Sequence, residues 1–134
     1  MNHFSIFAHG ENFDVDSYIQ NAALKPDHVW RRGDQKSGTD GGEFPKSSGV
    51  KYILGDGNLI SPWDQELQAI EFLTNHCEAL QALNETAGVT TFILGLQYNA
   101  RLGPSTIGFS VGASTLLMWH IVNVGAEFRV YVTL

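Results

Sequence analysis

Apolar side chains recur along the chain with two different spacings. Near the N-terminus Phe4, Ile6 and Ala8 stand two residues apart, and this alternation predicts a strand over residues 3–8. Runs rich in β-branched and aromatic residues predict further strands. These further strands are expected at residues 28–32, 51–54, 89–98 and 127–134.

A spacing of three to four residues predicts a helix after Asp14, a favourable N-cap, and this helix must end close to Pro26. A later helix is predicted at residues 111–122, with Ser110 as its cap and Gly125 as its terminator. This later helix is apolar nearly all round, so we expect it to be deeply packed.

The clearest local signal lies between these two helices. Ser61 is a capping residue and Pro62 suits the first helical position, so a helix is predicted from there to about Asn84. Its inner stripe is expected to consist of the apolar residues at helical spacing: Trp63, Leu67, Ile70, Leu73, Cys77 and Leu80.

This alternation of strands and helices predicts a fold of the α+β class. The chain of 134 residues is long enough for one domain, so we expect a single α+β domain over residues 1–134. A ferredoxin-like or related sheet of about five strands, mostly antiparallel, with helices packed on one face would accommodate the elements. Gly- and Ser-containing segments predict flexible loops at about 35–50 and 99–106.

The charge is unevenly distributed along the chain. Fourteen acids against eight Lys and Arg give a net charge of −6, and residues 51–88 hold six acids and one Lys. Because phosphate neutralisation supplies most non-specific affinity for nucleic acids, an acidic chain is a poor nucleic-acid binder. We therefore expect no nucleic-acid partner and favour a basic protein partner.

Motifs for catalysis and metal binding are missing from the sequence. No two of the five His stand at the i, i+4 spacing of a helical metal site, and Cys77 is the only cysteine. We therefore expect no metal and no cofactor, and a binding protein rather than an enzyme. No apolar run approaches the ~20 residues of a membrane span, and the N-terminus lacks a signal-peptide pattern, so we expect a cytoplasmic protein without membrane contact.

Two segments of the sequence resemble a known family. Residues 13–19 (Phe-Asp-Val-Asp-Ser-Tyr-Ile), Pro26 and residues 30–34 (Trp-Arg-Arg-Gly-Asp), together with the tail from Phe109, resemble an uncharacterised family of small bacterial domains of unknown function with a Trp-Arg-x-Gly-Asp signature. The chain departs from this family at Tyr52, where a Trp is expected. The resemblance implies an α+β fold and a bacterial origin, and it implies no activity.

Four acids in the predicted middle helix form the most specific candidate surface. Asp64, Glu71, Glu78 and Glu85 are seven residues apart, so in one straight helix they would form a single slowly drifting stripe. Phe72 is expected to project away from the core beside them. These five residues are the predicted partner-binding site, and an immunity protein that neutralises a basic bacterial toxin is one concrete form of this function.

Two alternatives remain open at this stage. Trp30, Arg31, Arg32, Asp34 and Arg101 could hold a small anionic ligand, because guanidinium groups bind carboxylates and phosphates bidentately. The protein would then be a ligand sensor or an enzyme. The other alternative is a structural subunit that forms a homodimer through its sheet face or an edge strand.

Overall fold

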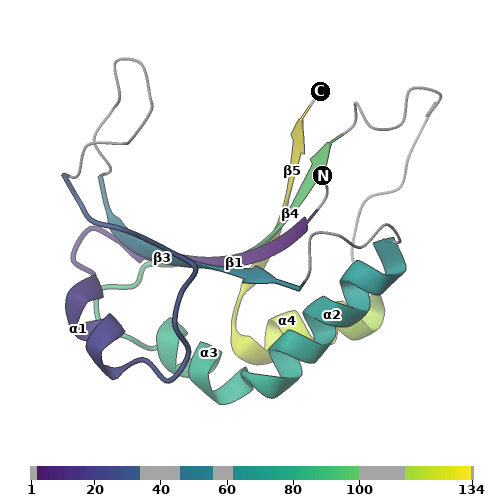
Figure 1. Cartoon of the computed structure of the whole chain (residues 1–134), viewed down its shortest axis with the longest axis horizontal. Helices are drawn as coiled ribbons and strands as arrows, with labels where there is room; N and C mark the ends of the chain where they lie inside the picture. The colour runs from purple at the N-terminus through teal and green to yellow at the C-terminus, as the bar shows by residue number, and fades with distance from the viewer. Residues whose placement is uncertain (1–2, 34–45, 56–61, 100–113, 134) are drawn as a thin grey trace.

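Five strands form one sheet, and four helices lie against one of its faces (Figure 1). The computed structural model describes residues 3–33, 46–55, 62–99 and 114–133. The strands are β1 (His3–Gly10), β2 (His28–Trp30), β3 (Ser48–Leu54), β4 (Thr91–Asn99) and β5 (Glu127–Thr133). The helices are α1 (Val15–Asn21), α2 (Pro62–Asn75), α3 (Cys77–Asn84) and α4 (Thr115–Val124).

The strands are arranged in the order β2-β3-β1-β4-β5. β1 is central and runs antiparallel to both β3 and β4, and β2 is antiparallel to β3. β5 extends the sheet parallel to β4, with α4 as the crossover between them. The predicted α+β class, with about five mostly antiparallel strands and helices on one face, is confirmed, whereas the narrower ferredoxin-like arrangement stays a prediction.

The core fills the space between the sheet and the helices. Phe4, Ile6 and Ala8 of β1 are buried on the helix side, which confirms the alternation seen in the sequence. Leu73 and Ile121 are among the helix residues that are at most 1% exposed against them. The core continues on the neighbouring strands through Val50, Tyr52, Leu54, Phe92, Leu94 and Leu96.

Helix α1 begins as its sequence predicts. The Asp14 carboxylate accepts hydrogen bonds from the backbone N–H and the hydroxyl of Ser17, at 3.1 and 2.8 Å, and these bonds lower the pKa of Asp14. The helix ends at Asn21, earlier than Pro26 requires. The chain after it is fixed to the sheet because the Tyr52 hydroxyl donates to the Leu24 carbonyl at 2.8 Å.

The predicted middle helix is divided into two helices. α2 ends at Asn75 and α3 begins at Cys77, with His76 between them at φ −119° and ψ 22°. Pro62 opens α2 as predicted, whereas Ser61 lies outside the described residues. The prediction of one continuous helix to Asn84 is therefore wrong.

The start of β3 also differs from the sequence prediction. The segment expected to be a loop up to residue 50 already pairs as strand from Ser48. Gly49 pairs with His9 on one side and with Trp30 on the other, so the strand conformation there depends on partners far along the chain. The rest of the two predicted loops falls mainly on residues 34–45 and 100–113, which lie outside the described part.

The N-cap of α4 is Ser114, not the predicted Ser110, which lies outside the described residues. The Ser114 hydroxyl accepts a hydrogen bond from the Leu117 N–H at 3.2 Å. Gly125 terminates the helix at φ 86°, as predicted.

The Ser114 cap gives a first testable prediction. Ser114→Ala removes the acceptor for the Leu117 N–H, so we expect the free energy of unfolding to fall by about 1 kcal/mol. Thr115→Ala is the matched control, because Thr115 is exposed and is not the cap, and it should change stability by less than about 0.5 kcal/mol. Urea denaturation measures both variants, and equal losses would contradict a capping role for Ser114.

Candidate functional site

Acidic and basic side chains are separated between the helices and the strands. The four described helices contain Asp16, Asp64, Glu66, Glu71 and Glu78, and they contain no Lys or Arg. The five described strands contain Lys51 and Arg129 and a single acid, Glu127. The helix layer therefore presents a negative potential to the solvent that the sheet does not share.

All four acids of the predicted partner-binding stripe are exposed. Asp64 and Glu71 lie on α2, Glu78 lies on α3, and Glu85 is the C-cap residue of α3. Because the helix is interrupted at His76, the two pairs belong to separate helices and do not form one straight stripe. The exposure of these acids is as expected, and the single-helix geometry is wrong.

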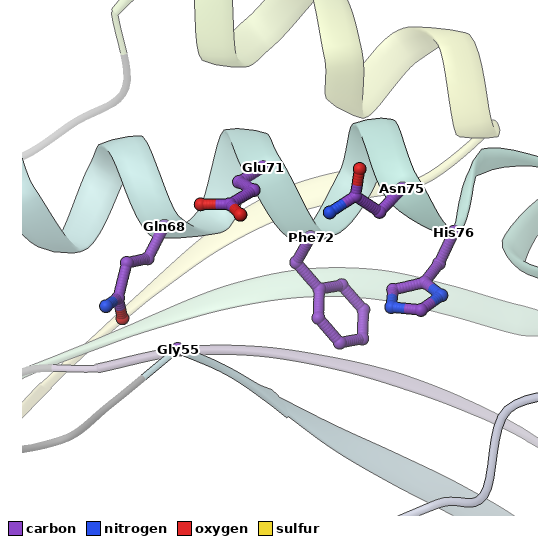
Figure 2. A pocket seen from close by; sticks show the side chains of 6 residues that line it. All are labelled: Gly55, Gln68, Glu71, Phe72, Asn75 and His76. Carbon is purple, nitrogen blue, oxygen red and sulfur yellow. The ribbon is translucent and has the colours of Figure 1, made fainter.

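Phe72 does not project away from the core, and this part of the prediction is wrong. Its side chain is half-buried and packs against the core, with its ring centroid 6.5 Å from that of Tyr52 and 4.7 Å from that of His76. Figure 2 shows the Phe72 and His76 rings pointing from the helix toward the strands. Both rings line a small pocket of about 220 Å³, together with Gly55, Gln68, Glu71 and Asn75.

A second hollow lies at the interruption between α2 and α3. It has a volume of about 810 Å³ and includes the half-buried Cys77, whose sulfur accepts a hydrogen bond from the Asn123 side-chain amide at 3.2 Å. Within the described ranges, no group of three or more His, Cys, Asp or Glu is placed to hold a metal ion. None of the helices described is long and apolar enough to cross a membrane.

The exposed apolar side chains of the helix layer lie mainly on α4. Leu116 is 52% exposed, Trp119 is 62% exposed and Val122 is 70% exposed. The opposite side of the same helix is buried through Leu117 and Ile121. The helix is deeply packed, as predicted, on one side only, and its other side is open.

Both ends of α4 are hydrogen-bonded to the acidic helices α2 and α3. At its N-terminal end the Ser114 N–H donates to the Glu66 carboxylate of α2 at 2.7 Å. At its C-terminal end the Gln81 amide of α3 donates to the Asn123 carbonyl, also at 2.7 Å. Leu67 of α2, expected on the inner stripe, is 42% exposed and adds to the apolar surface. We define the helix patch as a set of exposed residues of the helix layer: Leu67, Leu116, Trp119 and Val122 with the acids Asp64, Glu71 and Glu78.

Trp119 was not among the candidate residues, although the sequence contained a signal for it. A helix that is apolar on every side must either be surrounded by protein or expose apolar groups to the solvent. Residues 116, 119 and 122 recur every three positions and so follow one side of the helix. Which side is exposed depends on where the sheet lies.

The alternative anionic-ligand site is only partly described. Arg31 forms an ion pair with Asp16 at 2.7 Å, which lowers the pKa of Asp16. Trp30 is half-buried and Arg32 is exposed, with the Arg32 backbone N–H donating to the Ser48 hydroxyl at 2.9 Å. Asp34 and Arg101 lie outside the described residues. The guanidinium of Arg31 is thus engaged by a carboxylate of the protein itself.

Comparison with known proteins finds no relative: no family model, no curated protein and no solved structure matches the chain. The resemblance to an uncharacterised bacterial family stays a prediction.

Proposed function

We propose that this chain is a non-enzymatic binding protein that docks a basic protein partner through the helix patch. The observation that carries the proposal is the exposed apolar side of α4, centred on Trp119, beside helices that contain acids and no Lys or Arg. Single exposed apolar residues are ordinary, whereas contiguous apolar patches with polar rims are typical of interaction sites.

The composition of the helix patch fits the usual anatomy of a protein interface. Aromatic residues are enriched at the centre of interfaces, and Trp is prominent among the residues whose truncation costs most affinity. Trp119 takes the role that the sequence suggested for Phe72, because Phe72 packs against the core.

The acids of the helix patch favour a basic partner. Complementary charge accelerates association and rejects partners of like charge, and it acts most strongly at low salt. An immunity protein that covers the cationic substrate site of a bacterial toxin, such as a nuclease, is the most concrete form of this proposal.

The test begins with capture from a lysate of the organism that encodes the chain. The captured protein is identified and purified, and its affinity is measured by calorimetry at about 50 and about 200 mM salt. Glu71→Lys/Glu78→Lys should weaken binding at least about tenfold, which is about 1.4 kcal/mol, and should flatten its salt dependence. Trp119→Ser should weaken binding by a similar factor at both salt concentrations.

The control is Glu11→Lys, which reverses one exposed acid in the turn between β1 and α1, outside the helix layer. It should leave the affinity within about twofold of that of the unmodified protein, because surface charges far from an interface are screened. Equal losses in the control and in the helix-patch variants would overturn the proposal. So would a partner whose affinity is insensitive to both Trp119→Ser and the charge reversal.

A further inference from the structure

The sheet face that points away from the helices carries a row of four rings. Trp30 of β2, His9 and Phe7 of β1, and Tyr131 of β5 follow one another across the sheet, with successive ring centroids 6.3, 6.3 and 6.2 Å apart. The helices lie on the opposite face (Figure 1), and Phe7 and His9 alternate with the core residues Ile6 and Ala8. The row therefore spans the sheet from one edge strand to the other.

Two glycines allow these rings to lie against the sheet. A Cβ atom on Gly95 would stand 2.9 Å from the Tyr131 ring and 3.5 Å from the Phe7 ring. A Cβ atom on Gly49 would collide with the Trp30 indole. Glycine in a strand interior weakens the strand unless something approaches it closely, and here the approaching groups are the rings.

The middle of the row consists of Phe7 and His9. Partial burial and the nearby charge of Arg129 lower the pKa of His9, which favours the neutral form of its imidazole. Two residues from Phe7 on β1, the Ser5 hydroxyl is fully buried, and it has no hydrogen-bond partner among the described residues. The row is thus a set of flat, mainly apolar rings, each of which is half-buried.

Lys and Arg side chains lie close to the row of rings. Lys51 is the cross-strand neighbour of Phe7, and Arg129 lies two residues from Tyr131 on the same face of β5. Glu127 is the one acid in the described strands, and the Arg129 guanidinium donates to its carboxylate at 3.0 Å. Arg32 and Lys46 are exposed next to the Trp30 end of the sheet.

We propose that this face, which we call the ring face, binds single-stranded nucleic acid, with bases stacked on Phe7, Tyr131 and Trp30 and phosphates near Lys51 and Arg129. Aromatic side chains on an open sheet stack unpaired bases whatever their sequence, and flanking cations hold the backbone. An extended polymer suits a row that crosses five strands better than a compact ligand does.

The net charge of −6 does not oppose this binding. The helices α2 and α3, which carry exposed acids, lie on the other side of the sheet from the ring face (Figure 1). A helix with its side chains is about 10 Å across, which is comparable with the Debye length of about 8 Å at physiological salt. The expectation of no nucleic-acid partner depends on the charge of the whole chain, whereas the described strands contain Lys51, Arg129 and the single acid Glu127.

The test uses fluorescein-labelled oligo-dT and oligo-rU of about 12 nucleotides, with binding followed by anisotropy from about 50 to 200 mM salt. Phe7→Leu and Tyr131→Leu each remove one stacking ring and keep an apolar cover. Each should weaken binding about five- to 150-fold. Phe7→Tyr keeps the ring and should bind within about threefold of the unmodified protein. Lys51→Gln/Arg129→Gln should reduce the salt slope by about one to two.

Trp119→Leu is the matched control, because it removes an exposed ring from the helix layer and should leave oligonucleotide binding unchanged. Urea denaturation shows that each variant is folded before its affinity is compared, and Tyr131→Leu serves if Phe7→Leu does not fold.

Failure of both oligonucleotides to bind at about 50 mM salt would overturn the proposal. Binding that survives both ring removals, or that falls equally in Trp119→Leu, would also overturn it. Because the helix patch is on the other side and is tested with a protein partner, either proposal can fail alone.

Discussion

Ile121→Ala should lower the free energy of unfolding by about 2–5 kcal/mol, whereas Val122→Ala, one residue along the same helix, should change it by less than about 0.5 kcal/mol. Ile121 is fully buried against the sheet, so truncation removes apolar contacts and leaves a cavity. Val122 is 70% exposed on the open side of α4, so its truncation removes little buried surface. Ile121→Ala deletes three carbon atoms and Val122→Ala deletes two, so the two substitutions differ mainly in burial.

Equilibrium urea denaturation followed by circular dichroism measures both changes, with the slope of each transition used to check that unfolding stays two-state. A loss of more than about 1.5 kcal/mol in Val122→Ala would mean that the open side of α4 is covered in solution. The helix patch would then not be a free surface, and the proposed docking site would lose its basis. A loss of less than about 1 kcal/mol in Ile121→Ala would contradict the packing of α4 on the sheet.

The sequence correctly predicted helix caps and strands where they depend on residues close together in the chain. Asp14 caps α1 through Ser17, three residues away, and Gly125 ends α4 in the left-handed conformation that glycine favours. The alternation of Phe4, Ile6 and Ala8 correctly predicted the strand β1, and these three residues face the core. These features involve contacts within one turn or one strand, so they do not depend on the order of the strands.

The orientation of the middle helix could not be read in this way. A helical wheel drawn over one straight helix placed Leu67 inside and Phe72 outside, and the structure reverses both positions. No Pro or Gly marks the interruption at His76 in the sequence. The helical wheel therefore treated α2 and α3 as one helix, although they face the core differently. The inner side of α2 is set by what it packs against, including Tyr52 of β3.

The two candidate surfaces were hidden in the sequence for a related reason. The ring face joins residues of β1, β2 and β5, which are neighbours only because the strand order is β2-β3-β1-β4-β5. The helix patch is exposed because α4 covers the sheet with one side only. The sequence shows that these positions are aromatic or apolar. The order of the strands and the packing of α4 determine which of them lie together on a surface.

Gly88→Ala should lower the free energy of unfolding by about 2–5 kcal/mol, well beyond the effect of Gly33→Ala, which should be about 1 kcal/mol. Both glycines have a positive φ, 89° at Gly88 and 85° at Gly33, so alanine meets the same backbone strain at both. The difference lies in the surroundings. A Cβ atom on Gly88 would stand 2.7 Å from the Phe13 Cα and closer still to the Asn12 backbone, whereas nothing lies within 4 Å of a Cβ atom on Gly33.

The corresponding asparagine variants separate backbone strain from collision. Asparagine tolerates the left-handed region, so Gly33→Asn should stay within about 0.5 kcal/mol of the unmodified protein. Gly88→Asn should remain strongly destabilised, because the obstacle is the backbone of the turn between β1 and α1 and cannot rotate away as a side chain can. Urea denaturation of all four variants measures this difference. If Gly88→Asn recovered as fully as Gly33→Asn, the close approach between the β1–α1 turn and the α3–β4 turn would be disproved, and with it the anchor that joins the two turns at this end of the sheet.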